Sequence, residues 1–116
     1  MTIEELDVDV VNQFLADIGD AAPELINLFI SESRARFIRM GQLTADKNWT
    51  ALASEAHALK SVAKTYGLVC LGDVADHLEQ ACLKGLPRDI RQHLDVIQNS
   101  AEAAFKALAA KAGMQN

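Results

Sequence analysis

The sequence predicts an all-α fold, an antiparallel up-and-down four-helix bundle with an additional short N-terminal helix. Apolar residues recur at helical spacing along most of the chain, and no segment alternates with the period of two that marks strands. Aromatic residues make up only 5% of a chain that is 50% hydrophobic, with alanine and leucine dominant, a mixture that suits packed helices. The segments between the periodic stretches are short, so successive helices should run antiparallel.

Residues that begin and end helices divide the chain into its elements. Gly19, Gly67, Gly85 and Gly113 each follow a periodic stretch, as glycines after helix ends do. Prolines open the second and fifth helices, and Asn48 is placed to cap the third. The predicted helices cover residues 7–18, 23–46, 49–66, 68–84 and 87–112.

Composition excludes several classes of function. A length of 116 residues predicts a single domain over residues 1–116. The formal net charge is -5 without any run of lysine and arginine, which argues against a nucleic-acid partner. No apolar span approaches the roughly 18 residues that a membrane helix needs, and the acidic start lacks the features of a signal peptide. We therefore expect a cytoplasmic protein.

The two cysteines, Cys70 and Cys82, are predicted to lie on one helix. About 18 Å of axial rise would separate them, whereas a disulfide needs Cα atoms within about 7 Å. Thiols are the expected state, which agrees with a cytoplasmic location.

His57 stands apart from the apolar stripe of the third helix. On a helical wheel it lies roughly opposite the core face, which is formed by Leu52, Ala56, Leu59, Ala63 and Tyr66. Small serines one turn to either side should leave the imidazole accessible. Glu55 falls near the apolar edge, and the sequence gives no reason for it.

Lys60 and Lys64 follow His57 at three and seven residues, on the same side of the helix. Two ammonium groups would disfavour protonation of the imidazole and favour an anion attached to it. Histidine is a covalent nucleophile, so an exposed neutral histidine beside cations is suited to carrying a phosphoryl group. The alternative is that His57 is an incidental surface residue and that the lysines are a solvated face.

The run from His57 to Leu68, HALKSVAKTYGL, resembles the signature of histidine-containing phosphotransfer (HPt) domains. In that family the run reads His-x-Leu-Lys-Gly-Ser/Ala-Ala/Ser-x-x-x-Gly-Leu. Ser61 stands where the family has glycine, and Lys64 stands where a small residue is usual. Downstream, Leu71 and the pair Leu78-Glu79 also fall where the family has matching residues.

The resemblance implies a histidine phosphotransfer protein of a multistep two-component phosphorelay. His57 would accept a phosphoryl group, on Nε2, from a receiver-domain phosphoaspartate and pass it to the aspartate of another receiver. Lys60 would lie near the phosphoryl oxygens, with Ser61 and Lys64 beside the site, and Glu79 would bond Nδ1 and orient the ring. The chain would have no cofactor of its own, because the partner receiver supplies Mg²⁺.

The expected partners are receiver domains of response regulators and of a hybrid histidine kinase, with the chain itself a monomer. It would be a phosphocarrier rather than a kinase, because no Gly-rich ATP-binding segment is present. The alternatives are a non-catalytic helical-bundle adaptor and a kinase-dimerisation-type bundle, each with an incidental surface histidine.

Four apolar residues of the second helix lie outside its apolar stripe: Leu25, Leu28, Ile38 and Leu43. They would either form the edge of a receiver-binding patch or pack under the first or fifth helix.

A metal site is disfavoured, because His57, His77 and His93 fall on three different helices and form no pair one turn apart. His77 and His93 are interpreted as surface residues.

Overall fold

The computed structural model of the chain describes residues 6–114, and within them it is all-α. The helices are α1 (Val8–Ile18), α2 (Ala22–Ala45), α3 (Trp49–Thr65), α4 (Val69–Lys84) and α5 (Pro87–Lys111), with a 3-10 turn at Gly19–Ala21. Each helix boundary agrees with the sequence prediction to within one residue. The predicted fold class is therefore confirmed.

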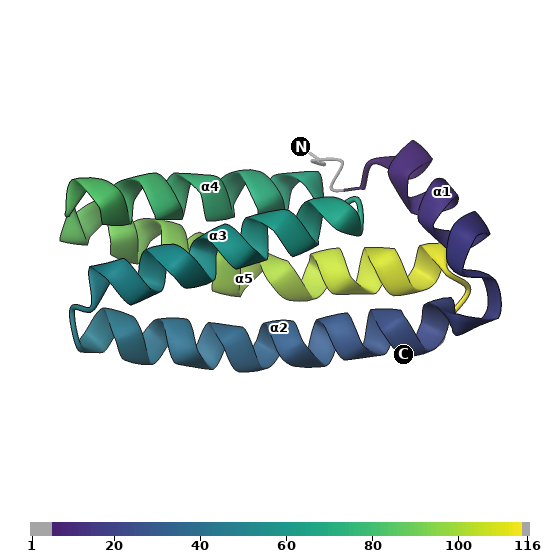
Figure 1. Cartoon of the computed structure of the whole chain (residues 1–116), viewed down its shortest axis with the longest axis horizontal. Helices are drawn as coiled ribbons and strands as arrows, with labels where there is room; N and C mark the ends of the chain where they lie inside the picture. The colour runs from purple at the N-terminus through teal and green to yellow at the C-terminus, as the bar shows by residue number, and fades with distance from the viewer. Residues whose placement is uncertain (1–5, 115–116) are drawn as a thin grey trace.

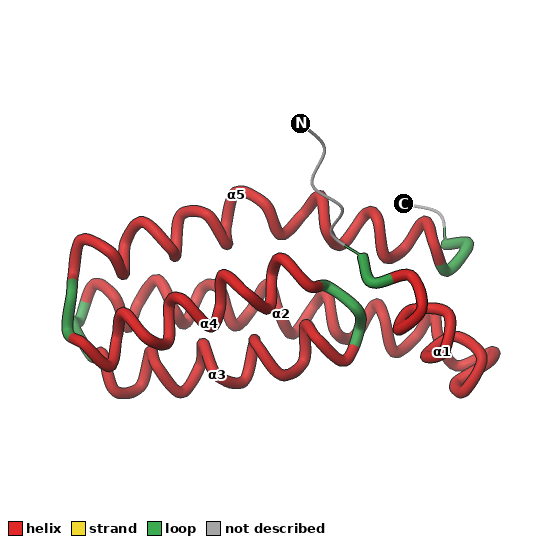
Figure 2. The backbone as a smooth tube through the Cα atoms, turned by 90° about the horizontal axis from the view of Figure 1, so that it is seen from above, coloured by secondary structure: helices red, strands yellow, loops and turns green. Residues whose placement is uncertain are grey.

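Helices α2 to α5 form an antiparallel bundle, and α1 lies across one end of it (Figure 1). Helix α3 packs between α2 and α4, while α5 contacts α2 and α4 and closes the bundle. Seen from above, the short loops sit at the two ends of the bundle (Figure 2). The sides of α3 and α4 that face away from α2 and α5 are left open to solvent.

Side chains at two helix starts accept hydrogen bonds from the backbone. The side chain of Asn48 accepts from the amide of Ala51 at 3.2 Å, so the predicted cap of α3 is confirmed. Asp7 accepts from the amide of Val10 at 3.2 Å and begins α1 in the same way. These bonds satisfy amides that have no partner within the helix.

An aromatic ladder joins α1 to the bundle core. Phe14 of α1 packs on Tyr66 with ring centroids 4.8 Å apart, and Tyr66 stacks on Phe29 of α2 at 4.3 Å. Phe105 of α5 contacts Phe29 edge-on and lies parallel to Phe37. Because Phe105 is only 2% exposed, the ladder runs through the centre of the molecule.

The turn between α3 and α4 sets the register of those two helices. The amide of Leu68 donates to the carbonyl of Ala63, and the amide of Gly67 donates to the carbonyl of Lys64. Gly67 has a φ of 76°, and a Cβ built there would lie 2.7 Å from a methyl carbon of Val11. Glycine is therefore needed both for the backbone conformation and for the close approach of α1.

The apolar residues of α2 outside its stripe separate into two groups. Leu43 is half-buried and packs against the core, and Leu25 is half-buried as well. Leu28 and Ile38 are 53% and 65% exposed.

In the described part of the chain, no helix combines the length and the apolar character needed to cross a bilayer.

Candidate functional site

His57 lies in the middle of α3 on the side away from the core. Its neighbours Ala56 and Leu59 are fully buried, whereas the His57 side chain is 60% exposed. Ser54 and Ser61, one turn before and after it, are exposed and short. The imidazole is therefore open to an approaching partner.

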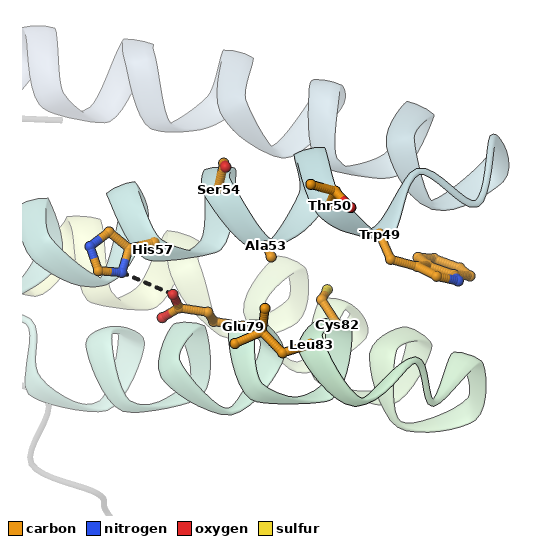
Figure 3. Close-up of a pocket in the computed structure, with 8 residues that line it drawn as sticks. All are labelled: Trp49, Thr50, Ala53, Ser54, His57, Glu79, Cys82 and Leu83. Atoms are coloured by element: carbon orange, nitrogen blue, oxygen red, sulfur yellow. Dashed lines mark hydrogen bonds and ion pairs between the residues drawn. The ribbon is translucent and has the colours of Figure 1, made fainter.

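Glu79 of α4 contacts the imidazole from one side. Its Oε2 lies 2.9 Å from Nδ1 of His57 (Figure 3). An ionised carboxylate can only accept a hydrogen bond, so Nδ1 is the donor and carries the ring proton. Nε2 keeps its lone pair and points away from Glu79 (Figure 3). For the neutral ring, the contact thus favours the tautomer in which Nδ1 carries the proton and Nε2 the lone pair.

Lys60 binds two carboxylates of α4. Its Nζ lies 3.0 Å from Oε1 of Glu79 and 3.1 Å from Oδ1 of Asp76. The hydrogen bonds to Glu79 and then to Asp76 raise the pKa of Lys60, and the bond from Lys60 lowers the pKa of Asp76. The Lys60 ammonium, expected near the imidazole, is thus paired with two carboxylates, one of which is the Glu79 carboxylate that also bonds His57.

Lys64 follows His57 by seven residues, two turns along the same side of α3. Its side chain is exposed, and it forms no ion pair with any residue that the structure describes. Its stem crosses α4 at Gly72, where an added Cβ would lie 3.0 Å from Cγ of Lys64. After the larger effects of Lys60 and His77, attraction to the charge of Lys64 also lowers the pKa of Asp76.

An open hollow of about 620 Å³ adjoins the imidazole between α3 and α4 (Figure 3). It is lined by Trp49, Thr50, Ala53, Ser54, His57, Glu79, Cys82 and Leu83. Leu83 is 67% exposed, which is unusual for a large apolar side chain beside a polar site. Sequence reasoning missed Leu83, because its place beside His57 depends on how α4 packs against α3.

Cys82 at the base of the hollow does not compete with His57 as a nucleophile. Burial, with a smaller effect from Glu79, raises the pKa of the Cys82 thiol to about 11. The thiolate is the reactive form, so the buried thiol is inert at neutral pH. Cys70 and Cys82 are not joined by a disulfide, as the spacing predicted.

Glu55, which the sequence left unexplained, pairs with two arginines of α2. Its Oε1 lies 2.7 Å from Nη1 of Arg36 and 3.3 Å from Nη2 of Arg39. The half-buried carboxylate therefore joins α3 to α2 on the side of α3 opposite His57.

A four-helix bundle with an exposed histidine held by a carboxylate defines the class of protein. The family model described as the Hpt domain matches residues 24–109, which include nearly all of α2 to α5. The chain therefore belongs to the Hpt domain family, as the resemblance indicated. Hpt domains act in histidine phosphotransfer within phosphorelays and interact with receiver domains. Comparisons with curated proteins and with solved structures gave no match.

Proposed function

We propose that His57 is the phosphoacceptor, taking a phosphoryl group from the phosphoaspartate of one receiver domain and passing it to the aspartate of another. The observation that carries the proposal is the bond between Nδ1 of His57 and Glu79 on a ring that is 60% exposed. In the neutral ring this bond places the proton on Nδ1, so that Nε2 is the nitrogen left with a lone pair on the accessible side. The donor would be the receiver of a hybrid histidine kinase, and the acceptor would be that of a response regulator.

The proposed transfer balances without any further reactant. Nε2 attacks the phosphorus of the acyl phosphate, the bond from phosphorus to the aspartate oxygen breaks, and the aspartate leaves as a carboxylate. Nδ1 keeps its proton, so the phosphorylated ring carries a positive charge, and Glu79 faces that charge. In the second step a receiver carboxylate attacks the phosphorus, the N–P bond breaks, and the neutral imidazole returns.

The supporting residues have different roles in this proposal. Lys60 holds Glu79 in place, and Ser61 keeps the approach to the ring open. Lys64 offers positive charge to the phosphoryl oxygens at the edge of the site. Mg²⁺ would come from the receiver, where it neutralises the oxygens during in-line transfer. The chain acts as a phosphocarrier, so ATP alone should not label it.

The surface that docks the receiver would surround His57, with Leu83, Ala53 and Trp49 of the adjoining hollow as its apolar part. Ile38, which the sequence offered for this role, lies elsewhere. Arg34, one turn before Ile38, bonds Glu102 of α5 at 2.9 Å, so Ile38 lies on the α5 side of α2. We also propose that the chain is a monomer and that it acts in the cytoplasm. Light scattering of the purified chain tests its oligomeric state.

Phosphotransfer from a labelled receiver tests the assignment of His57. The chain is incubated with a receiver domain carrying labelled phosphoaspartate and Mg²⁺, and acid-labile, alkali-stable label on the chain is measured. We expect His57→Gln to lose the label completely and the control His93→Gln to keep it. Label that persists on the His57→Gln variant would show that another residue is the acceptor.

A further inference from the structure

The fold brings together two histidines that lie on different helices, away from the phosphotransfer site. His77 of α4 is exposed and His93 of α5 is half-buried, and their ring centroids are 5.7 Å apart at an interplanar angle of 40°. Their separation of 16 residues along the chain concealed this contact from sequence reasoning. His77 and Glu79 are two positions apart on α4, so their side chains leave the helix on roughly opposite sides.

The spacing of the two rings fits coordination of one metal ion. A zinc–nitrogen bond measures about 2.0–2.1 Å, which places the centroid of a coordinated imidazole about 3.2 Å from the metal. Two such rings at a tetrahedral angle have centroids about 5.2 Å apart. The observed 5.7 Å differs by an amount that small side-chain rotations can close. The rings are tilted by 40° rather than stacked, so rotation about the side-chain torsions could bring one nitrogen of each ring toward a shared ion.

The two rings lie at an open hollow whose charged lining is one lysine and one aspartate. A surface hollow of about 340 Å³ is lined by both histidines and by Gln80, Ala81, Lys84, Leu86 and Asp89. Asp89 precedes His93 by one turn of α5, so its carboxylate lies in the same hollow and offsets the charge of Lys84. Within residues 6–114 no three His, Cys, Asp or Glu side chains are arranged to hold a metal ion, so water would fill the remaining positions.

We propose that His77 and His93 form a two-histidine site for a divalent transition-metal ion, which links α4 to α5. Imidazole nitrogen favours zinc, copper and nickel over magnesium or calcium. The site is separate from the proposed phosphotransfer site around His57. Its effect is structural, because an ion held between two helices binds the folded chain in preference to the unfolded one.

Metal titration of the full chain tests the site. Zn²⁺ binding is measured by calorimetry, and thermal unfolding is followed with and without saturating Zn²⁺. We expect one equivalent of Zn²⁺ per chain and a rise in Tm of about 5 °C, reversed by a chelator. When Cu²⁺ is bound in place of Zn²⁺, its electron paramagnetic resonance spectrum should show two nitrogen ligands.

Single substitutions assign the ligands. His77→Gln and His93→Gln should each weaken Zn²⁺ binding by more than about tenfold. Losing even a residue that only hydrogen-bonds a metal ligand usually lowers metal affinity by about 10–100-fold. His57→Gln is the matched control and should bind Zn²⁺ as the unsubstituted chain does. The proposal is overturned by an absence of saturable binding, by unchanged affinity in either ligand variant, or by loss of binding in His57→Gln.

Discussion

At the scale of the residue, the site is a network of charged side chains linked by hydrogen bonds, and the last of these bonds is to the imidazole of His57. Asp76 and Glu79 hold Lys60, and the second oxygen of Glu79 holds Nδ1 of His57. Glu79 is only 15% exposed, so its bonds are better shielded from water than those of the ring it orients. The acidic pair and Lys60 therefore act as one unit that favours the tautomer of His57 with its proton on Nδ1.

Substitutions of Glu79 should separate the hydrogen bond from the charge. Glu79→Ala removes the partner of Nδ1 and should slow phosphotransfer to His57 by about 10–100-fold, the range known for groups that orient metal-binding histidines. Glu79→Gln keeps an oxygen that can accept from Nδ1 but lacks the charge that faces the phosphorylated ring, so its rate should lie between those of Glu79→Ala and the unsubstituted chain. The measurement is the initial rate of label transfer from a phosphorylated receiver. Equal rates for Glu79→Ala and the unsubstituted chain would contradict the orienting role.

The ion pair of Asp76 predicts a pH dependence of stability. Lys60 lowers the pKa of Asp76, so the pair contributes fully above the ordinary aspartate pKa of about 3.9 and is lost as the pH falls through the lower folded pKa. The raised pKa of Lys60 acts in the opposite sense, with its contribution lost only as the pH rises through the folded lysine pKa.

Urea unfolding of the unsubstituted chain and of Asp76→Asn across this acidic range measures the effect. The unsubstituted chain should be the more stable near neutral pH, and the two unfolding midpoints should converge as Asp76 becomes protonated. A difference that stays constant down to about pH 2 would show that the pair does not stabilise the fold.

At the scale of the element, the hairpin of α3 and α4 determines where the functional side chains meet. His57 precedes Gly67 by ten residues and Glu79 follows it by twelve. At 1.5 Å per residue these positions lie about 15 Å and about 18 Å from the turn, so the two side chains are level across the hairpin. A turn of a different length would separate them, which makes Gly67 part of the site's construction although it touches no functional group.

Alanine substitutions at two glycines separate backbone strain from steric contact. Gly67 and Gly85 both have positive φ, at 76° and 66°, but a Cβ meets nothing within 4 Å at Gly85. Gly85→Ala should cost about 1–2 kcal/mol for the left-handed conformation alone. Gly67→Ala should cost a further 1–3 kcal/mol or so, because the methyl group would clash with Val11. Denaturant unfolding measures the loss of stability in both variants. Equal losses would show that α1 can shift to accommodate the methyl group at no cost in free energy.

At the scale of the whole molecule, the bundle is a rigid support that displays one face to a partner. Fully buried leucines, isoleucines and Met40 fill the core, and the aromatic ladder extends it beneath α1. Because such interiors are close-packed, the helices hold their relative positions while partners dock and leave.

The core should set stability without taking part in transfer. Phe105 packs on Phe29 and Phe37 and is 2% exposed, so Phe105→Ala should cost about 3–5 kcal/mol of unfolding free energy. Phe105→Leu, which leaves a smaller void, should cost less. Unfolding curves give both values, and the transfer rate per folded molecule should stay near that of the unsubstituted chain. A large loss of that rate in a folded variant would contradict the separation of core and site.

Two exposed apolar residues of similar exposure test the docking face. Leu83 is 67% exposed beside His57, and Ile38 is 65% exposed on the α5 side of α2. Burying a leucine side chain contributes about 1.5–3 kcal/mol, so Leu83→Ser should raise the apparent KM for the receiver by about 10–150-fold. Ile38→Ser should leave it within about twofold. If both variants behaved alike, the docking face would not be centred on the hollow beside His57.

Much of the fold followed from the sequence alone. Helical periodicity, with Asn48, the prolines and the glycines at the ends, located every helix to within one residue. The same periodicity placed His57 on the solvent side of α3, and the run from His57 to Leu68 indicated the family that the match over residues 24–109 shows. These features depend on local geometry, which a helix repeats every 3.6 residues whatever it packs against.

Apart from the contact of Glu79 with His57, which the resemblance implied, the contacts between helices were decided only by the tertiary structure. The binding of Lys60 to Asp76, the pairing of Glu55 with two arginines, and the meeting of His77 with His93 join residues 16 to 19 positions apart. A wheel shows which side of a helix a residue occupies, but which neighbour it meets depends on the crossing and register of two helices. The packing of the core and the turn at Gly67 fix both, and so they determine which charges surround His57.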